Sequence, residues 1–251
     1  MKSAAVIQAR MTSSRLPGKV MKVLSNELVI EHVINRLKRC SKISQIIVAT
    51  SIDASDNILA DWCQVNQIEC YRGSLNDVLA RYYEVAKIYN LHSIVRITAD
   101  CPLIDPEIVD EVVTNFMNGD YDFYALAGDF PDGLDCSVFS MSALQKSYEE
   151  AAKLSEREHI GAYIENNPST FKIGGLHKFK GQGLGGHRWT LDEPLDFKFL
   201  SIVCKALENK NKYFLSKDII TFLKDNPDIM KINSTIKRNE GYDLSLEQDE
   251  T

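Results

Sequence analysis

The sequence predicts an α/β protein: a single domain in which a mixed, mostly parallel sheet is flanked by helices. Two observations support this prediction. Segments typical of buried strands alternate with segments of helical period through residues 1–118, which is the pattern of a parallel sheet covered on both faces. The chain of 251 residues, with 44% hydrophobic and 25% charged residues, is also long and apolar enough for one large core.

The first four elements alternate strand and helix. Lys2–Ala9 is a short apolar segment and is expected to be a strand. Val29–Arg39 follows as a helix, because its apolar residues recur at helical spacing. Ile46–Thr50 is an uninterrupted apolar run, as in a strand covered on both faces. Ser55–Asn66 returns to the helical period.

The next four elements continue the alternation. Ile68–Tyr71 is a short strand candidate, and Asn76–Tyr89 carries apolar residues on one helical face. Ser93–Thr98 is expected to be another strand. Asp105–Asn118 is expected to be a helix with proline in its first turn, where proline is tolerated.

The second half of the chain is less regular. Tyr121–Leu126, Leu134–Ser140 and His187–Leu191 are expected to be strands. The glycine-rich segment Lys172–Gly186 predicts a hairpin or a mobile loop. The helices expected here are Ser142–Ala152, Ser155–Asn166, Leu195–Leu207 and Ser216–Lys224.

No internal repeat and no linker interrupt the sequence, so residues 1–251 are expected to form one domain. Residues 231–251 are a polar tail, and its end, Glu247–Thr251, is expected to fray.

The net charge of −6 argues against nucleic acid as a partner. Any anion must therefore be bound by a local cluster, and Arg10, Arg15 and Lys19 form one. The apolar segment at the start is too short for a signal peptide, and no apolar run approaches the length of a membrane span. The protein is therefore expected to be cytoplasmic, with no membrane partner.

Six scattered cysteines contain no Cys-x-x-Cys pair, so buried free thiols are expected rather than disulfides or a zinc site. His32 and His92 are expected to have structural roles. No Ser/His/Asp arrangement can be defended from the spacing.

A cationic, hydroxyl-rich loop, Gln8–Lys19, follows the first strand and ends at the turn dipeptide Pro17-Gly18. Backbone N–H groups, hydroxyls and arginine forks are all phosphate donors, and open α/β sheets bind ligands at strand carboxyl ends. The loop is therefore expected to bind phosphate. It is not a Walker loop, because it lacks the earlier glycine and Val20 follows Lys19.

A second glycine-rich stretch, Gly181–Gly186, formally matches the dinucleotide pattern G-x-G-x-x-G. It lies late in the chain and opens no helix after a strand, so we expect a flexible loop that could close over a substrate.

Asp100 and Asp192 each stand between an expected strand and an expected helix. Each could cap a helix or bind Mg²⁺, which prefers one or two carboxylates together with phosphate oxygens and water. Beside a phosphate-binding loop, the two aspartates together predict a metal pair.

Several motifs spread over nearly the whole chain are distinctive: Gln8–Lys19, Arg72-Gly73-Ser74, Asn76–Arg81, Arg96–Pro106, Gly133-Leu134-Asp135, Arg157-Glu158-His159, Arg188–Pro194, Ile232-Asn233-Ser234 and Lys237–Tyr242. The first and most specific resembles the signature loop of the cytidylyltransferases that activate acidic eight- and nine-carbon sugars. The chain looks similar to the 3-deoxy-manno-octulosonate type and closest to the spore coat polysaccharide biosynthesis protein SpsF group.

The resemblance implies a nucleotidyltransferase fold of the glycosyltransferase-A-like kind, with CTP as substrate and Mg²⁺ as cofactor. A sugar hydroxyl would attack the α-phosphate of CTP, and pyrophosphate would leave. Residues 1–118 would bind the nucleotide and residues 119–230 the sugar acceptor. Enzymes of this kind are often dimers, so a homodimer is expected.

The resemblance also assigns roles to residues. Arg10, Lys19 and Asp100 would be catalytic, and Asp100 and Asp192 would hold the metal. The nucleotide-binding residues would be Ala9, Arg10, Met11, Ser13, Arg15, Lys19, Arg72, Gly73, Ser74, Asp77 and Asp100. The residues that bind the acceptor would be Asp135, Arg157, Glu158, His159 and Arg188.

The chain departs from the resemblance at Cys101, where the enzymes of acidic sugars usually carry an acidic residue. Two alternatives remain open at this point. One is a pyrophosphorylase acting on a sugar 1-phosphate or another phosphorylated alcohol, with an extra cation from Lys172, Lys178 or Lys180. The other is a nucleotide-binding protein without turnover.

Overall fold

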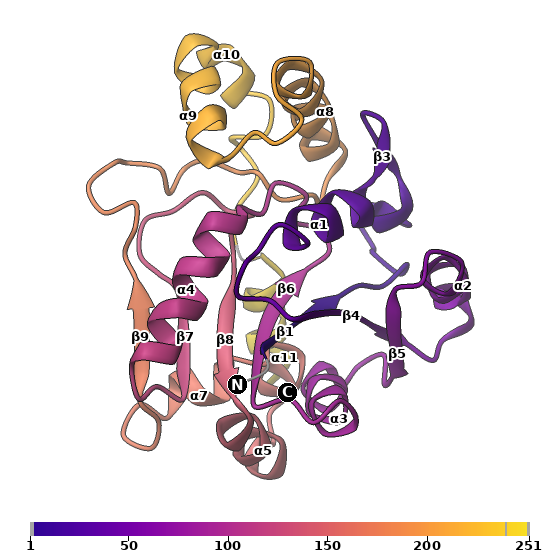
Figure 1. The fold of residues 1–251 in the computed structure, drawn as a ribbon, viewed down its shortest axis with the longest axis vertical. Coiled ribbons are helices and arrows are strands. Elements are labelled where there is room, and N and C mark those ends of the chain that lie inside the picture. The colour runs from indigo at the N-terminus through magenta and orange to yellow at the C-terminus, as the bar shows by residue number, and fades with distance from the viewer. Residues whose placement is uncertain (1–2, 239, 250–251) are drawn as a thin grey trace.

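The computed structural model describes residues 3–238 and 240–249. A seven-stranded sheet crosses the molecule in the order β5-β4-β1-β6-β8-β7-β9 (Figure 1). All neighbouring strands are parallel except the two pairs that include β8. The predicted mixed, mostly parallel sheet with flanking helices is therefore confirmed.

The four strands of the first half agree closely with the sequence pattern. They are β1 (Ser3–Gln8), β4 (Gln45–Ser51), β5 (Glu69–Gly73) and β6 (Ser93–Thr98). In β1, Ala5 and Ile7 belong to the apolar core on one face of the sheet, and Ala4 and Val6 belong to the core on the other face. This alternation follows from the two-residue period of a strand, and it explains why β1 is apolar throughout.

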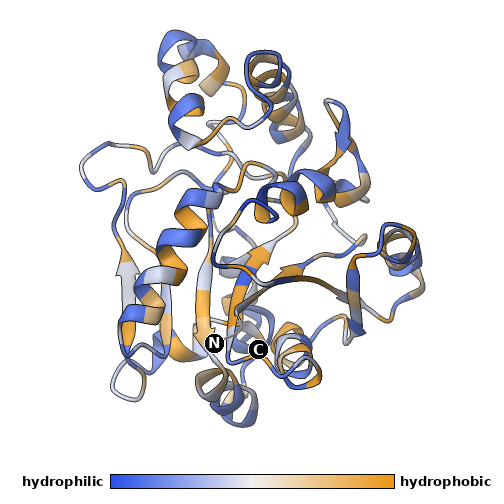
Figure 2. Cartoon of the chain, in the orientation of Figure 1, coloured by the Kyte–Doolittle hydropathy of each residue, from blue (hydrophilic) through white to orange (hydrophobic). Residues whose placement is uncertain are grey.

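Helices cover both cores, and hydrophobic residues lie along the central strands and on the helix sides that face them (Figure 2). The first core is covered by α1 (Val29–Leu37), α2 (Asn57–Val65), α4 (Pro106–Asn118), α8 (Pro194–Glu208) and α9 (Ser216–Asp225). The second core is covered by α3 (Val78–Ile88), α5 (Met141–Glu150) and α7 (Ala162–Asn166).

The sequence predictions for three segments of the second half differ from the structure. The expected hairpin or loop at Lys172–Gly186 begins instead with the edge strand β9 (Ile173–Leu176), which pairs in parallel with β7 (Phe123–Leu126). The expected strand at His187–Leu191 is reduced to a single bridge between Asp132 and Arg188. In the expected strand Leu134–Ser140, only β8 (Ser137–Ser140) is paired in the sheet.

Several elements differ from the sequence pattern or were not expected. The helix expected at Ser155–Asn166 breaks into α6 (Leu154–Glu158) and α7, because the backbone of His159 is extended. A small hairpin, β2 (Val23–Leu24) with β3 (Glu27–Leu28), precedes α1. Single turns form η1 (Lys19–Met21) and η2 (Ala54–Asp56).

Residues 247–249, which were expected to fray with the end of the tail, belong to a helix. After α10 (Pro227–Met230), α11 (Glu240–Asp249) packs against α6, where Asp249 accepts hydrogen bonds from the backbone and the hydroxyl of Ser155. Residues 250 and 251 of the tail, together with Lys2 of the first expected strand and Asn239 of the last motif, lie outside the described residues.

All six cysteines are free, and five of them are buried, which confirms the expectation of free thiols. Within the described ranges, none of the helices combines the length and the apolar character needed to cross a membrane.

Candidate active site

A cavity of about 1070 Å³ opens at the carboxyl edge of the sheet. Its walls come from the loops after β1 and β6, from the inner strands β7 and β8, from α6, and from the C-terminal tail. This size suits a nucleotide or sugar-sized ligand. The site residues predicted from sequence that line it are Ala9, Arg10, Ser13, Arg15, Lys19, Asp100, Asp135, Glu158, His159, Arg188 and Asp192.

The loop after β1 is held in shape by a residue that sequence analysis did not identify. Asp56 is fully buried, and its carboxylate accepts hydrogen bonds from the Met11 backbone N–H (2.6 Å) and the Ser51 backbone N–H (3.0 Å). Gly18 then turns the chain with φ +68°, a conformation that favours glycine. The turn brings Lys19 back toward the sheet edge.

Lys19 lies between Asp100 and Asp192. Its Nζ donates to Asp100 Oδ2 and to Asp192 Oδ1, both at 2.7 Å. Burial would lower the pKa of Lys19, but the two carboxylates outweigh it and raise that pKa. Burial likewise would raise the pKa of Asp100, but the Lys19 ammonium holds it at about 2. The carboxylates of Asp100 and Asp192 thus both contact the same ammonium group.

Neither aspartate caps a helix, so the capping alternative is wrong for both. The cap of α8 is Glu193, and the backbone N–H groups of Asp192 and Glu193 both donate to Asp196 at 2.9 Å. The cap of α4 is Asp105, which accepts from the Glu107 backbone. The carboxylates of Asp100 and Asp192 are thus left to face Lys19 and the cavity.

Arg188 is a buried hub that fixes Asp192. Its guanidinium makes a two-pronged contact with Asp196 (2.9 and 3.0 Å) and also donates to Asp132 at 2.9 Å and to Asp192 at 3.1 Å. Since these acceptors occupy the guanidinium, the geometry favours a positioning role for Arg188 over direct binding of the acceptor. Asn233 supports the hub by donating to Asp196.

Two further cations reach the cavity from the loop and the tail. Arg15 pairs with Glu240 at 2.7 Å and with Asp192 at 3.4 Å. Arg238 donates to the Phe130 carbonyl at 2.9 Å and pairs with Asp135 at 3.3 Å. The C-terminal segment therefore contributes charge directly to the site.

The far end of the cavity holds two of the residues expected to bind the acceptor, Glu158 and His159. Ser245 of α11 donates to Glu158 at 2.8 Å, and its hydroxyl lies 3.3 Å from His159 Nε2. Burial lowers the pKa of His159, which favours the neutral imidazole. Arg96 of β6 also lines this end, and its buried Nε has no hydrogen-bond partner among the described residues.

Some of the predicted site residues lie outside the cavity lining. Arg72 donates to the backbone carbonyls of Ser51 and Asp53. Asp77 caps α3 and accepts from Arg157 Nε at 3.0 Å. The predicted residues outside the lining are Met11, Arg72, Gly73, Ser74, Asp77 and Arg157.

Sequence reasoning assigned no site role to Asp132, Asp196, Arg96, Arg238 and Tyr242, all of which lie at or directly behind the cavity wall. Arg96, Arg238 and Tyr242 stand within the distinctive motifs. The turn dipeptide Asp132-Gly133 is a sequence signal for Asp132. For Asp196 the signal is its position three residues after Glu193, the cap of α8, where an acidic side chain can accept from the backbone of the cap residue. No local signal indicated that the tail returns to the site.

Cys101, where the chain departs from the resemblance, lies beside Asp100 with Sγ 3.7 Å from Oδ1. Burial, with the negative charges of Asp100 and Asp135, raises the pKa of Cys101 well above its usual range. It therefore adds no negative charge to the aspartate pair. The Gly181–Gly186 pattern forms turns and opens no helix, which excludes a dinucleotide fingerprint there.

The donor set fits a divalent cation of the magnesium type. Both carboxylates contact one cationic atom, the Lys19 Nζ, so the same pair can contact one metal ion. Mg²⁺ takes one or two carboxylates and completes its shell with phosphate oxygens and water, and the open cavity leaves room for both.

Comparison with known proteins finds relatives of this chain in sequence and in fold. The family model described as cytidylyltransferase matches residues 4–216. The chain is 36% identical over 238 residues to Uncharacterized protein MJ1063 of Methanocaldococcus jannaschii (95% of this chain, 97% of the relative). It is 29% identical over 230 residues to the spore coat polysaccharide biosynthesis protein SpsF of Bacillus subtilis (89% and 94%). A solved cytidylyltransferase from Leptospira borgpetersenii superposes with a TM-score of 0.85 at 32% identity, covering 95% of this chain and all of that one.

Proposed function

The chain belongs to the cytidylyltransferase family, and we propose that it transfers CMP from CTP to an acidic sugar, with Mg²⁺, for surface polysaccharide or glycan biosynthesis. In this reaction an acceptor hydroxyl oxygen bonds to the α-phosphorus of CTP. The bond from that phosphorus to the α–β bridging oxygen breaks, pyrophosphate leaves, and the proton of the hydroxyl passes to solvent water.

The observation that carries the proposal is the position of Lys19. Its ammonium lies 2.7 Å from each of two carboxylates at the end of a cationic loop. Such a cluster can hold a triphosphate together with a metal ion, because nucleotidyl transfer requires positioning and neutralisation of charge more than covalent help. Arg10, which lines the cavity and is exposed, is free to approach the phosphates.

Asp100 and Asp192 would hold the magnesium ion, and its charge would offset the charge that develops on the phosphates. Lys19 would then turn from the carboxylates to the phosphate oxygens. Arg188 and Asp196 would keep Asp192 in place during this exchange, since they fix its side chain and its backbone.

The base and ribose would lie toward the Ala9 backbone and the segment Arg72–Asp77 at the ends of β1 and β5. Arg81, immediately behind Gly73, supports a ligand on this side. Its guanidinium is buried, and all three of its nitrogens lack hydrogen-bond partners within the described part of the chain.

The acceptor would occupy the end of the cavity lined by Arg96, Asp135, Glu158 and His159. Arg96 supports an anionic acceptor, because its buried Nε has no protein partner in the described ranges. A carboxylate is the group that a guanidinium binds well in two-pronged geometry. This argument, together with the sequence resemblance, favours a sugar acid.

The test is a matrix of nucleotides against acceptors, read as pyrophosphate released. We expect CTP with a sugar acid to give the highest rate. Asp100→Asn should abolish turnover while the circular dichroism spectrum stays native, whereas the matched control Asp120→Asn, at a fully exposed carboxylate, should leave the rate unchanged. A near-normal rate for Asp100→Asn with Mg²⁺ would exclude the metal role.

The alternative of a pyrophosphorylase acting on a sugar 1-phosphate required an extra cation, and the three lysines considered for that role do not support it. Lys172 pairs with Asp120 and Lys178 pairs with Glu111, and neither they nor Lys180 are among the described residues of the cavity lining. The same matrix separates the two reactions. The family assignment makes the chain a nucleotidyltransferase, so a binding protein without turnover is not retained.

We place this enzyme in the cytoplasm, where CTP is available, with no nucleic acid or membrane as partner. A homodimer remains a prediction, which sedimentation of the purified chain would test.

A further inference from the structure

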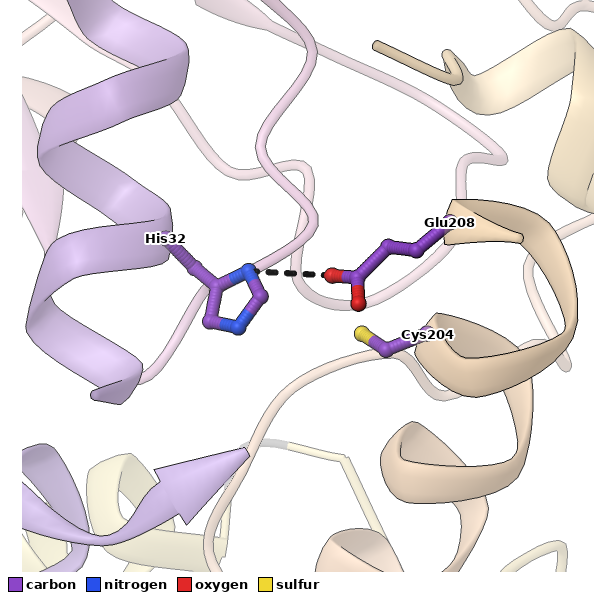
Figure 3. A group of neighbouring side chains, drawn as sticks. All are labelled: His32, Cys204 and Glu208. Atoms are coloured by element: carbon purple, nitrogen blue, oxygen red, sulfur yellow. Dashed lines mark ion pairs between the residues drawn. The ribbon is translucent and has the colours of Figure 1, made fainter. Parts of the chain in front are cut away.

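We propose that His32, Cys204 and Glu208 form a second, structural metal site, distinct from the aspartate pair, that takes a zinc-like divalent cation. His32 lies on α1, and Cys204 and Glu208 lie one turn apart on α8. Their side chains converge from the two helices (Figure 3), and their ligand atoms all lie within 4.8 Å of one another. None of the three lines the cavity described above.

The tautomer of His32 is set for metal binding. Its Nε2 lies 2.8 Å from the Leu24 carbonyl, which can only accept, so Nε2 carries the proton and donates it. The lone pair of the neutral ring is then on Nδ1, which faces Glu208. Metal-binding histidines commonly donate their other ring N–H to a backbone carbonyl in this way.

The contact between His32 and Glu208 leaves a space suited to a cation. Nδ1 lies 3.8 Å from Glu208 Oε1 (Figure 3), too far for a hydrogen bond. Two ligands bound to one tetrahedral zinc ion lie roughly 3.3–3.6 Å apart, given zinc–ligand bonds of about 2.0–2.3 Å. The other carboxylate oxygen of Glu208 accepts from the Ser25 hydroxyl at 2.6 Å, which orients Oε1 toward His32.

Cys204 supplies the soft ligand. Its side chain is fully buried, and burial together with the Glu208 charge raises the pKa of its thiol to about 12. The Arg36 guanidinium opposes this rise but does not overcome it. A divalent metal ion bound between the sulfur and the carboxylate would favour the thiolate. The set of one nitrogen, one sulfur and one oxygen ligand suits zinc, with water as a fourth ligand.

The site would connect three elements of the fold. Leu24 and Ser25 belong to the β2–β3 hairpin, His32 to α1, and Glu208 to the end of α8. Glu208 is partly exposed, with 19% of its side chain accessible, so an ion can enter from solvent. Metal binding would therefore hold the hairpin and α1 against α8, and it would stabilise the fold without taking part in the reaction.

The probe is Co²⁺, titrated into the full-length protein without nucleotide and followed by the thiolate-to-cobalt charge-transfer band in the near ultraviolet. We expect one equivalent to give the band. Cys204→Ser should abolish it, and Glu208→Gln should weaken Co²⁺ binding at least about tenfold. Zn²⁺ should displace Co²⁺ and raise Tm in the wild type.

Cys101→Ser and Asp100→Asn are the matched controls, because Cys101 is the thiol beside the aspartate pair. The band should persist in both variants. No band in the wild type, a band that survives Cys204→Ser, or a band lost in Cys101→Ser would each overturn the site. If Cys204→Ser does not fold, Glu208→Gln decides, since unchanged Co²⁺ affinity in that variant contradicts the proposal.

Discussion

Two aspartates near the cavity have opposite protonation behaviour, because their neighbours differ. Burial acts on both Asp100 and Asp132 to favour the neutral acid. At Asp100 the Lys19 ammonium overcomes burial and holds the pKa at about 2. At Asp132 burial and the negative charge of Asp135 outweigh Arg238 and Arg188, and the pKa rises to about 6. Residue type alone therefore does not predict the charge of a group in this site.

The raised pKa of Asp132 predicts a loss of stability as pH rises. Between pH 4 and pH 6 the folded protein binds a proton at Asp132 that the unfolded chain has released, so this group's contribution falls by about 2–3 kcal/mol across that window. Asp100 does not oppose this fall, because its contribution is lost only below about pH 4.

Urea unfolding of the wild type and of Asp132→Asn at pH 4.5 and pH 7 measures the effect. The variant should lose less stability than the wild type over this interval. Asp120→Asn, at an exposed carboxylate, should follow the wild type. Equal pH slopes for the wild type and Asp132→Asn would contradict the raised pKa.

Lys19→Ala should chiefly weaken binding of the triphosphate. The change removes one charged donor from the phosphates, and hydrogen bonds to charged groups are worth about 1.5–3 kcal/mol. The dissociation constant for CTP should therefore rise roughly 10- to 150-fold. Calorimetry with CTP measures it, and Lys22→Ala, in which a nearby lysine outside the cavity lining is removed, serves as the control. Unchanged CTP affinity would exclude the proposed role of Lys19.

At the scale of elements, the site depends on two irregular segments that lie side by side. The backbone N–H of Asp132 donates to the His187 carbonyl at 2.9 Å, and Trp189 donates back to the Asp132 carbonyl. Gly133 follows with φ +103°, and a Cβ there would lie 2.5–2.8 Å from backbone atoms of Trp189 and Thr190. This close approach positions Arg188 and Asp192.

Gly133→Ala should therefore destabilise the protein by about 2 kcal/mol or more and reduce turnover, because both the positive φ and the backbone contact exclude a side chain. Gly186→Ala is the matched control, since a Cβ at that glycine meets no atom within 4 Å. Thermal unfolding and pyrophosphate release measure the two effects. Native Tm and rate in Gly133→Ala would show that the segments can move apart.

The accuracy of the sequence predictions follows from the physics of each element. The strands of the first half were predicted nearly to the residue, since burial on both faces makes them continuous apolar runs. The edge strand β9 contains Gly174 and Gly175, which carry no hydrophobic signal. The segment at His187–Leu191 resembles a strand in sequence, but it makes only one bridge because it packs on a loop.

At the scale of the whole molecule, the site was predictable where it follows from the sheet. Loops after parallel strands meet at one edge, which is why Lys19 and Asp100 could be paired from the sequence. Asp192 was paired with Asp100 from the sequence as well, although the strand expected before it is only a single bridge. The residues of the tail needed the whole chain to fold. Arg238, Glu240 and Ser245 return from the C-terminal end to cover the cavity, and no local pattern encodes that return.

The returning tail predicts a specific effect of truncation. Deleting residues 239–251 removes Glu240 from Arg15 and Ser245 from Glu158, and it opens the acceptor end of the cavity. The sheet and both cores should remain, because α11 contributes no residue to either apolar core.

We expect the truncated protein to keep a native circular dichroism spectrum, with the acceptor KM raised about tenfold or more, equivalent to about 1.4 kcal/mol of lost binding. The CTP KM should change less, because Lys19, Asp100 and Asp192 stay in place. Ser245→Ala, which keeps α11 but loses the bond to Glu158, should give a smaller rise in the same direction. If the truncation raises the CTP KM and leaves the acceptor KM unchanged, the tail covers the nucleotide instead, and the acceptor must bind elsewhere in the cavity.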